Sequence, residues 1–330
     1  MARLQGPEWL YEEGIGENRA ILIEDGQIAE AAIELPGTLP AGSIVPARMT
    51  RILVPRRRGI LAIEGGEALI EPLAADLTEG QALTVEILRE ALAEEGRSKL
   101  ARARASSAPV RPGPTLRDRI GGATRSDPVG PDRFEEAGWS ELLEEASSGE
   151  IAFIGGALRM SLTPAMTLFD VDGDLPPAVL AMAGAEAAAR AIRRFGVTGS
   201  IGIDLPTMPA KADRQAAAEA VDAILPQPFE RTAVNGFGFL QIVRKRERPS
   251  LPELLQADRV GAAARALLRR AERTPGSGPR ILHAAPAVAA RIERHPQWLD
   301  ALARRLGAPA SLQAEPGLAI SAGHVHSRTL

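Results

Sequence analysis

The chain of 330 residues contains no cysteine. Disulfide bonds, thiolate zinc sites, iron–sulfur clusters and cysteine nucleophiles are therefore all excluded. We expect no disulfide-linked partner, and any metal ion has to be held by oxygen atoms or by histidine nitrogen atoms.

Aromatic residues, an excess of one charge and long apolar runs are also scarce. Only 3% of the residues are aromatic, so we expect little stacking chemistry, and the net charge of -3 gives no global field that favours nucleic acid or an anionic membrane. No stretch reaches the roughly 18 apolar residues of a membrane helix, and residues 1–13 lack an apolar signal region. We expect no membrane partner and a cytoplasmic location.

What is present predicts several domains. In residues 1–36, two alternating apolar runs surround Asp25-Gly26, a pattern typical of a β-hairpin, which we expect to pack on the domain at residues 151–251. Residues 37–103 contain five short strand patterns at regular spacing, which indicates a small closed barrel of the OB type.

Residues 97–133 differ in composition from the rest of the chain. They hold nine basic and three acidic residues, five prolines and no aromatic residue. A loop or linker is one interpretation, and a flexible cationic arm that binds a polyanion is the other. We assign residues 104–150 to this basic linker and a short helix that follows it.

Strand and helix patterns alternate in the remaining sequence. Residues 151–251 predict an α/β catalytic domain, and residues 252–330 a small C-terminal α/β domain. The predicted fold class is therefore α/β in a multi-domain α+β chain.

Two aspartates end neighbouring apolar strand patterns. Asp170 and Asp204 flank one predicted crossover helix, and in a parallel sheet both then project into the crevice outside the strand ends. Such a pair of carboxylates suits Mg²⁺. The alternative is that each aspartate is a turn former or helix N-cap. The run from Asp170 to Asp174 lacks the spacing of a calcium loop.

Three ordered motifs resemble the bacterial ribonuclease E/G endoribonucleases. They are GGALRMSLTPAMTLFDVDG at 155–173, GSIGIDLPTM at 199–208 and FGFLQIVRKRERPSL at 237–251. The resemblance implies a deoxyribonuclease-I-like catalytic domain in which Asp170 and Asp204 bind Mg²⁺ and are catalytic. It further implies hydrolysis of single-stranded RNA by a metal-positioned water, which leaves a 5′-phosphate and a 3′-hydroxyl. Asp172 replaces the family's asparagine and joins the expected metal ligands.

The chain departs from the family pattern in ways that limit which properties of the family we expect it to share. The chain between Arg104 and Gly155 is too short for the family's 5′-monophosphate sensor, and the missing cysteines remove its zinc-link. We therefore expect Mg²⁺ but no zinc, no zinc-linked partner, and a monomer or dimer. Ile60 and Ile70 stand where family barrels often carry stacking aromatics, which predicts weak binding by the barrel. The alternative function is an RNA-binding protein that keeps the fold with little or no catalysis.

The remaining candidates are basic residues and histidines. The basic residues at the barrel turn, and those expected near the catalytic mouth, either contact phosphate groups or lie on a solvated surface. His324 and His326 alternate on one strand without a visible third ligand, and His283 is interpreted as structural. Gly236 and Gly238 indicate either a close approach of RNA or a bulge. The predicted RNA-binding residues are Arg56, Arg57, Arg58, Lys211, Arg214, Arg244, Lys245 and Arg246.

Overall fold

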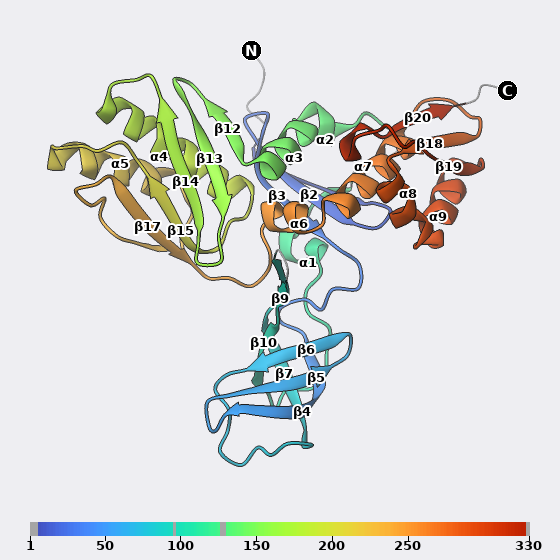
Figure 1. Ribbon diagram of the computed structural model, residues 1–330, viewed down its shortest axis with the longest axis horizontal. Helices are drawn as coiled ribbons and strands as arrows, with labels where there is room; N and C mark the ends of the chain where they lie inside the picture. The colour runs from blue at the N-terminus through green and yellow to red at the C-terminus, as the bar shows by residue number, and fades with distance from the viewer. Residues whose placement is uncertain (1–5, 95–96, 126–129, 328–330) are drawn as a thin grey trace.

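The computed structural model describes residues 6–94, 97–125 and 130–327. Its N-terminal sheet has the order β11-β1-β2-β3 (Figure 1). Asp25 and Gly26 both have positive φ angles, 51° and 78°, as a tight hairpin turn requires. The predicted hairpin is therefore confirmed, as β2 and β3 of a larger sheet. Its strands are β1 (Glu8–Glu13), β2 (Asn18–Glu24), β3 (Gln27–Glu34) and β11 (Thr124–Arg125).

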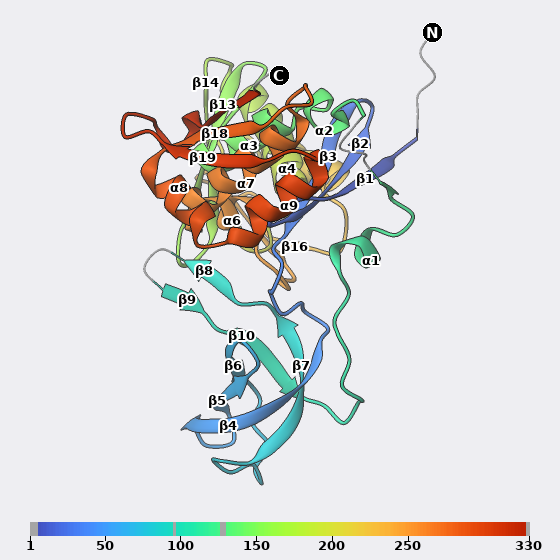
Figure 2. The ribbon, with the colours of Figure 1, turned by 90° about the vertical axis from the view of Figure 1, so that its right-hand side faces the viewer.

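A closed five-stranded barrel projects from the rest of the molecule (Figures 1 and 2). The strand order is β10-β6-β5-β4-β7, and β6 and β10 run parallel. Met49, Leu61 and Ile87 fill its interior. The strands are β4 (Ile44–Val54), β5 (Arg58–Ile63), β6 (Gly66–Ile70), β7 (Ala82–Arg89) and β10 (Ala101–Ala105). A hairpin of β8 (Leu92–Glu94) and β9 (Arg97–Lys99) connects β7 to β10.

The interpretation of residues 97–133 as a linker or flexible arm is wrong in part. This segment supplies β9, the closing barrel strand β10, α1 (Leu116–Ile120) and β11, whereas residues 106–115 between β10 and α1 form no helix or named strand. Its cations also pair locally, with Arg104 2.7 Å from Glu86 and Arg119 3.5 Å from Glu34. Local composition missed these elements because β10 forms only through pairing with β6 and β7. Residues 126–129 of the segment lie outside the described residues.

A six-stranded sheet with the order β12-β13-β14-β15-β17-β16 forms the central part of the chain. Only β14 and β15 run parallel, joined by the predicted helix α4 (Pro177–Arg194), and α4 and α5 (Lys211–Ile224) cover one face (Figure 1). Gly184 permits this packing, because a Cβ there would lie 2.4 Å from Val171. The strands are β12 (Glu150–Phe153), β13 (Gly156–Leu162), β14 (Thr167–Gly173), β15 (Gly199–Asp204), β16 (Glu230–Arg231) and β17 (Phe239–Arg244).

Short helices fill the space between the sheets. The short helix predicted before residue 150 is divided by Gly138, whose φ is 94°, into α2 (Arg133–Glu136) and α3 (Trp139–Ser148). Trp139 is fully buried in the main core. The helical segment at residues 251–273 is likewise divided at Asp258, into α6 (Leu251–Ala257) and α7 (Arg259–Arg273).

The C-terminal unit is a three-stranded sheet of order β19-β18-β20 with helices packed against it. Leu268, Leu282 and Ile292 are central to its core. Strand β19 pairs parallel with β18, and the chain then returns as β20, which pairs antiparallel with the other side of β18. The elements are β18 (Arg280–Ala284), α8 (Pro286–Glu293), α9 (Pro296–Leu306), β19 (Ala310–Ala314), η1 (Ile320–Ala322) and β20 (His324–Ser327).

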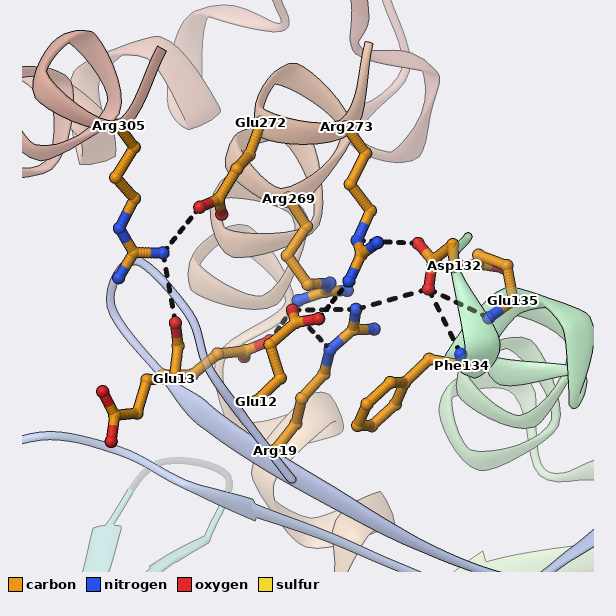
Figure 3. Close-up of polar contacts among 11 residues, drawn as sticks. Glu12, Glu13, Arg19, Asp132, Phe134, Glu135, Arg269, Glu272, Arg273 and Arg305 are labelled. Atoms are coloured by element: carbon orange, nitrogen blue, oxygen red, sulfur yellow. Dashed lines mark hydrogen bonds and ion pairs between the residues drawn. The ribbon is translucent and has the colours of Figure 1, made fainter. Parts of the chain in front are cut away.

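A buried cluster of charged side chains, which we call the ionic junction, joins the N-terminal sheet to α2 and α7. Arg19 lies 2.9 Å from Glu12, and Arg273 lies 2.9 Å from Asp132 (Figure 3). Glu17 is 1% exposed and pairs with two arginines of α7. The junction comprises Glu12, Glu17, Arg19, Asp132, Arg265, Arg269 and Arg273.

The architecture is thus mixed α/β with a closed five-stranded barrel and several sheets. Among the described helices, none combines the length and the apolar character needed to cross a membrane.

Candidate active site

The six-stranded sheet has one buried face and one open face. Along β14, Phe169 and Val171 are buried against the helices, whereas Asp170 and Asp172 are exposed. Successive side chains of a strand point to opposite faces, so both aspartates lie on the face that α4 and α5 do not cover. Strand β15 repeats the pattern, with Ile203 buried and Asp204 exposed.

The strand register places five side chains of this face in one line. Glu150 pairs with Arg159, Arg159 with Asp170, Asp170 with Asp204, and Asp204 with Phe239. The line crosses β12, β13, β14, β15 and β17 in turn. We call these five residues the cross-strand row. Asp170 and Asp204 are at its centre.

The two central aspartates are close together and unpartnered. Neighbouring strands are about 4.8 Å apart, so carboxylates at paired positions lie within reach of one cation. In the described part of the chain, neither the Asp170 nor the Asp204 carboxylate has a hydrogen-bond or ion-pair partner. Two like charges directly opposite each other destabilise a sheet, and a bound cation removes that repulsion.

The prediction that the aspartates project into a crevice of a parallel sheet is wrong in its geometry. Most strands of this sheet are antiparallel, and the aspartates lie on an open face near the ends of the parallel pair. A cavity of about 910 Å³ lies elsewhere, beside the ionic junction, and is lined by residues such as Arg19, Arg269 and Arg273. An open face admits a long polymer more easily than a closed pocket does.

Asp172 belongs to the same face but not to the row. It lies two residues beyond Asp170, roughly 6.6 Å along the strand, and its register partner on β13 is Ala157. Strand β15 ends at Asp204, so no β15 residue lies opposite Asp172. Its Oδ1 atom accepts a hydrogen bond from the Gly173 N–H at 2.9 Å. The structure therefore brings together Asp170 and Asp204 and leaves Asp172 one step outside.

The sequence analysis did not single out three members of the row, Glu150, Arg159 and Phe239. The Nε atom of Arg159 lies 3.4 Å from Glu150, and both side chains are largely exposed. Phe239 packs beside Asp204, where the absence of a side chain at Gly202 makes room for its ring. The only local signal was the alternation in β13 and β17, since the pairing with the aspartates depends on register.

A further missed residue, Phe237, lies outside the row and is 84% exposed in the loop before β17. The Oδ1 atom of Asn235 accepts hydrogen bonds from the N–H groups of Phe237 and Phe239, at 2.9 and 3.0 Å. Gly238 has a φ of 94°, and a Cβ there would lie 2.1 Å from the Leu205 carbonyl oxygen. This turn therefore holds an exposed aromatic ring beside the end of β15.

Two predicted RNA-binding residues lie on the segment that follows Asp204. Lys211 is exposed at the first position of α5, and in the described structure it has no ion-pair partner. Arg214 donates hydrogen bonds from Nη1 to the carbonyl oxygens of Met208 and Pro209, at 2.6 and 2.8 Å. Lys211 is therefore available to a ligand, whereas Arg214 stabilises the loop before α5.

The prediction that Arg244, Lys245 and Arg246 lie near the mouth is wrong. Arg244 pairs with Gly199 at the opposite end of β15, five residues and roughly 17 Å from Asp204. Burial lowers the pKa of Arg244, which donates to the Val197 carbonyl oxygen at 3.0 Å. Lys245 lies 2.6 Å from Glu247, and Arg246 pairs with Glu253. These cations support the fold.

The barrel residues Arg56, Arg57 and Arg58 lie at the turn between β4 and β5. Arg57 and Arg58 are 3.7 and 3.1 Å from Glu71 and remain partly exposed. Ile60 and Ile70 are 4% and 0% exposed, and Ile70 belongs to the barrel core. The interpretation as a lost stacking position is therefore wrong for Ile70.

The prediction that no third ligand accompanies His324 and His326 is also wrong. His283 joins them, and one possible ligand atom from each of the three lies within 4.8 Å of the others. No local pattern indicated this third histidine, because about forty residues separate the two strands.

No protein-family model matches this chain, and no curated protein matches it either.

Proposed function

We propose that this protein is a magnesium-dependent endoribonuclease that cleaves single-stranded RNA on the open face of its six-stranded sheet. The observation that carries the proposal is the register pairing of Asp170 with Asp204, both exposed and both without an ionic partner. The chain's resemblance to the ribonuclease E/G endoribonucleases, through the motifs at 155–173, 199–208 and 237–251, supports the same assignment.

The donor set fits a hard cation. Asp170 and Asp204 supply carboxylate oxygen atoms, the ligands that Mg²⁺ prefers alongside water and phosphate oxygen atoms. When bound, the ion neutralises charge at the scissile phosphate and lowers the barrier to attack by water. Hydrolysis with departure of the 3′-oxygen leaves a 3′-hydroxyl and a 5′-phosphate. Asp172, on the same face, would add negative charge beside the ion.

The neighbours of the aspartates have distinct roles in this proposal. The guanidinium of Arg159 leans toward Glu150 and is exposed, so it can donate hydrogen bonds to a phosphate flanking the cleaved bond. Lys211 adds a second cation beyond the end of β15. The ring of Phe237 offers a face on which an unpaired base stacks. The selectivity for single strands follows, because bases in a duplex are already stacked.

Two finer fold assignments belong to the proposal. The barrel connectivity, with β6 and β10 parallel, fits an OB-type fold, which binds oligonucleotides through its second and third strands and adjacent loops. Arg56, Arg57 and Arg58 lie at the loop between its first two strands. The six-stranded sheet is assigned as deoxyribonuclease-I-like on the motif resemblance. With no room for a 5′ sensor, RNA with a 5′-monophosphate or a 5′-triphosphate should be cut equally.

The test is cleavage of a short, unstructured, end-labelled RNA in Mg²⁺ by the wild type and by the Asp170→Asn and Asp204→Asn variants. We expect each substitution to lower the rate at least about 100-fold, equivalent to about 2.7 kcal/mol. Asp300→Asn, an exposed aspartate on α9, is the matched control and should cleave like the wild type. Equal cleavage by all four proteins rules out these carboxylates as the metal ligands.

The replacement of the family's asparagine by Asp172 favours a second candidate, an RNA-binding protein with little or no catalysis. It predicts RNA binding that weakens steeply with salt, together with no metal-dependent cleavage. Fluorescence anisotropy with the same RNA, run at several salt concentrations beside the cleavage assay, separates the two. An Asp172→Asn variant that gains cleavage would favour this second candidate for the natural chain.

A further inference from the structure

Three of the four histidines of the chain converge on one face of the C-terminal sheet. His283 of β18 pairs directly with His324 of β20, and Ile281 pairs with His326. Side chains at alternate positions of a strand share a face, so all three imidazoles point the same way. Leu282, which precedes His283 on β18, is fully buried on the opposite face.

The three rings are close enough to bind one ion. The ring centroids are 4.6 Å apart for His283 and His324, 4.8 Å for His283 and His326, and 5.2 Å for His324 and His326. One nitrogen atom of each ring lies within 4.8 Å of the others. A tetrahedral zinc site needs nitrogen atoms about 3.4 Å apart, which rotations about the side-chain torsions provide.

A carboxylate orients the most buried histidine. Nδ1 of His283 lies 2.5 Å from the Glu315 carboxylate, and the Glu315 backbone N–H donates to the Ala284 carbonyl oxygen at 2.8 Å. Metal-binding histidines typically donate their second N–H to a carboxylate in this way. The Nε2 atom of His283 is buried and has no hydrogen-bond partner in the described structure. On the His283 ring, the nitrogen atom without a partner is therefore the one left for a ligand.

The fourth histidine shows what a structural histidine looks like here. His295 stacks on Trp298 with ring centroids 4.2 Å apart, and its Nδ1 lies 2.9 Å from the Arg291 carbonyl oxygen. It therefore has both a packing partner and a polar partner. The packing neighbours of His283 include two further imidazoles, and a buried polar atom without a partner is costly to the fold.

We propose that His283, His324 and His326 bind one divalent transition-metal ion of the zinc type, independently of the proposed nuclease site. Three neutral imidazoles suit Zn²⁺, and less exclusively Cu²⁺ or Ni²⁺, whereas Mg²⁺ prefers oxygen ligands. His326 is exposed, so the fourth position of a tetrahedral ion faces solvent. The ion clamps β20 to β18. Glu315 is a positioning residue that fixes the His283 ring.

The test is titration of tag-free protein, freed of metal with a chelator, with Zn²⁺ alone in a calorimeter. An Asp170→Asn, Asp204→Asn background removes binding at the nuclease site, so the two proposals can fail separately. We expect one ion per chain, a higher melting temperature in Zn²⁺, and loss of both effects in a His324→Ala, His326→Ala variant. The His295→Ala control should bind like its parent.

The positioning role has its own measurement. Glu315→Gln should weaken Zn²⁺ binding about 10- to 100-fold while one ion per chain still binds. Circular dichroism of each metal-free variant checks that it folds, and binding of Co²⁺, followed by its visible absorption, reports tetrahedral coordination directly. Absence of Zn²⁺ binding by the folded parent, or unchanged binding after loss of both His324 and His326, overturns the proposal.

Discussion

The ionic junction and the cross-strand row use the same kinds of side chain in opposite ways. In the junction, Glu17 is 1% exposed and pairs with Arg265 at 2.8 Å and with Arg269. In the row, Asp170 and Asp204 are exposed, adjacent and unpaired. Buried charges need partners from the same chain to offset their lost hydration, whereas an exposed like-charged pair leaves its neutralisation to a ligand. Partnership therefore distinguishes structural carboxylates from candidate functional ones.

The largest expected effect is at the junction. Glu17→Ala leaves Arg265 and Arg269 buried without their carboxylate, so the free energy of unfolding should fall by about 3–5 kcal/mol. Urea denaturation followed by circular dichroism measures it. The matched control is Glu186→Ala, which breaks an exposed pair with Arg190 on α4 and should cost less than about 1 kcal/mol. Equal losses in the two variants would contradict the comparison.

The second effect is the stabilisation that Mg²⁺ gives when it binds at the cross-strand row. At a Mg²⁺ concentration 100 times the dissociation constant, the free energy of unfolding of the wild type should rise by about 2.7 kcal/mol. Asp204→Asn should abolish most of this gain because it removes half of the carboxylate pair. Thermal unfolding at increasing Mg²⁺, with the same ionic strength kept by sodium, provides the measurement. A gain that persists in Asp204→Asn would place the ion elsewhere.

Aromatic rings extend the same contrast. Beside the junction, Phe134 and Trp139 are buried, and the centre of the Phe134 ring lies 4.1 Å from the Arg19 guanidinium carbon. Phe237 beside the row is 84% exposed. Phe237→Ala should weaken binding of a single-stranded oligonucleotide by about 1–3 kcal/mol and leave stability nearly unchanged. Anisotropy titration tests the first point, and Phe237→Tyr, which keeps the ring face, should retain affinity.

A smaller, pH-dependent effect is expected at Asp258, which lies between α6 and α7 at the edge of the junction. Burial alone would raise its pKa, but hydrogen bonds from Arg291 and from the Gly261 N–H hold the pKa below the ordinary value. A carboxyl group with a lowered pKa stabilises the fold above its ordinary pKa of 3.8, and this contribution is lost as the pH falls through the folded value.

Asp258→Asn keeps the oxygen that caps α7 but removes the charge. The variant should be less stable than the wild type by about 0.5–1 kcal/mol at pH 7, and the difference should shrink below about pH 4. Denaturation curves at a series of pH values measure it. A stability difference between the wild type and Asp258→Asn that grows toward low pH would contradict the stabilising role of the Asp258–Arg291 pair.

The smallest expected effect has the opposite direction. In the absence of divalent ions, Asp170→Asn should raise the free energy of unfolding by about 0.2–1 kcal/mol, because it removes the repulsion with Asp204. The same substitution is expected to lower RNA cleavage. A loss of stability in Asp170→Asn would mean that this carboxylate has a structural partner after all, and the contrast with Glu17 would then fail.

Parts of the fold were predictable wherever a local pattern is enough. The turn residues Asp25 and Gly26 fix a hairpin, and the alanine-rich helix at 177–194 follows from its proline start and apolar periodicity. The fifth barrel strand was not predictable, because the arginine-rich segment at 101–105 becomes a strand only by closing the barrel between β6 and β7.

The same division applies to the candidate site. Local patterns are enough to place two aspartates at strand ends, to exclude thiolate ligands and to show a short alternating histidine pair. Strand pairing is needed to see that Asp170 and Asp204 share a register, that Arg159 and Phe239 extend their row, that Arg244 lies at the far end, and that His283 joins His324. Periodicity fixes which face a side chain takes, whereas the register between distant strands is set by packing and closure of the whole sheet.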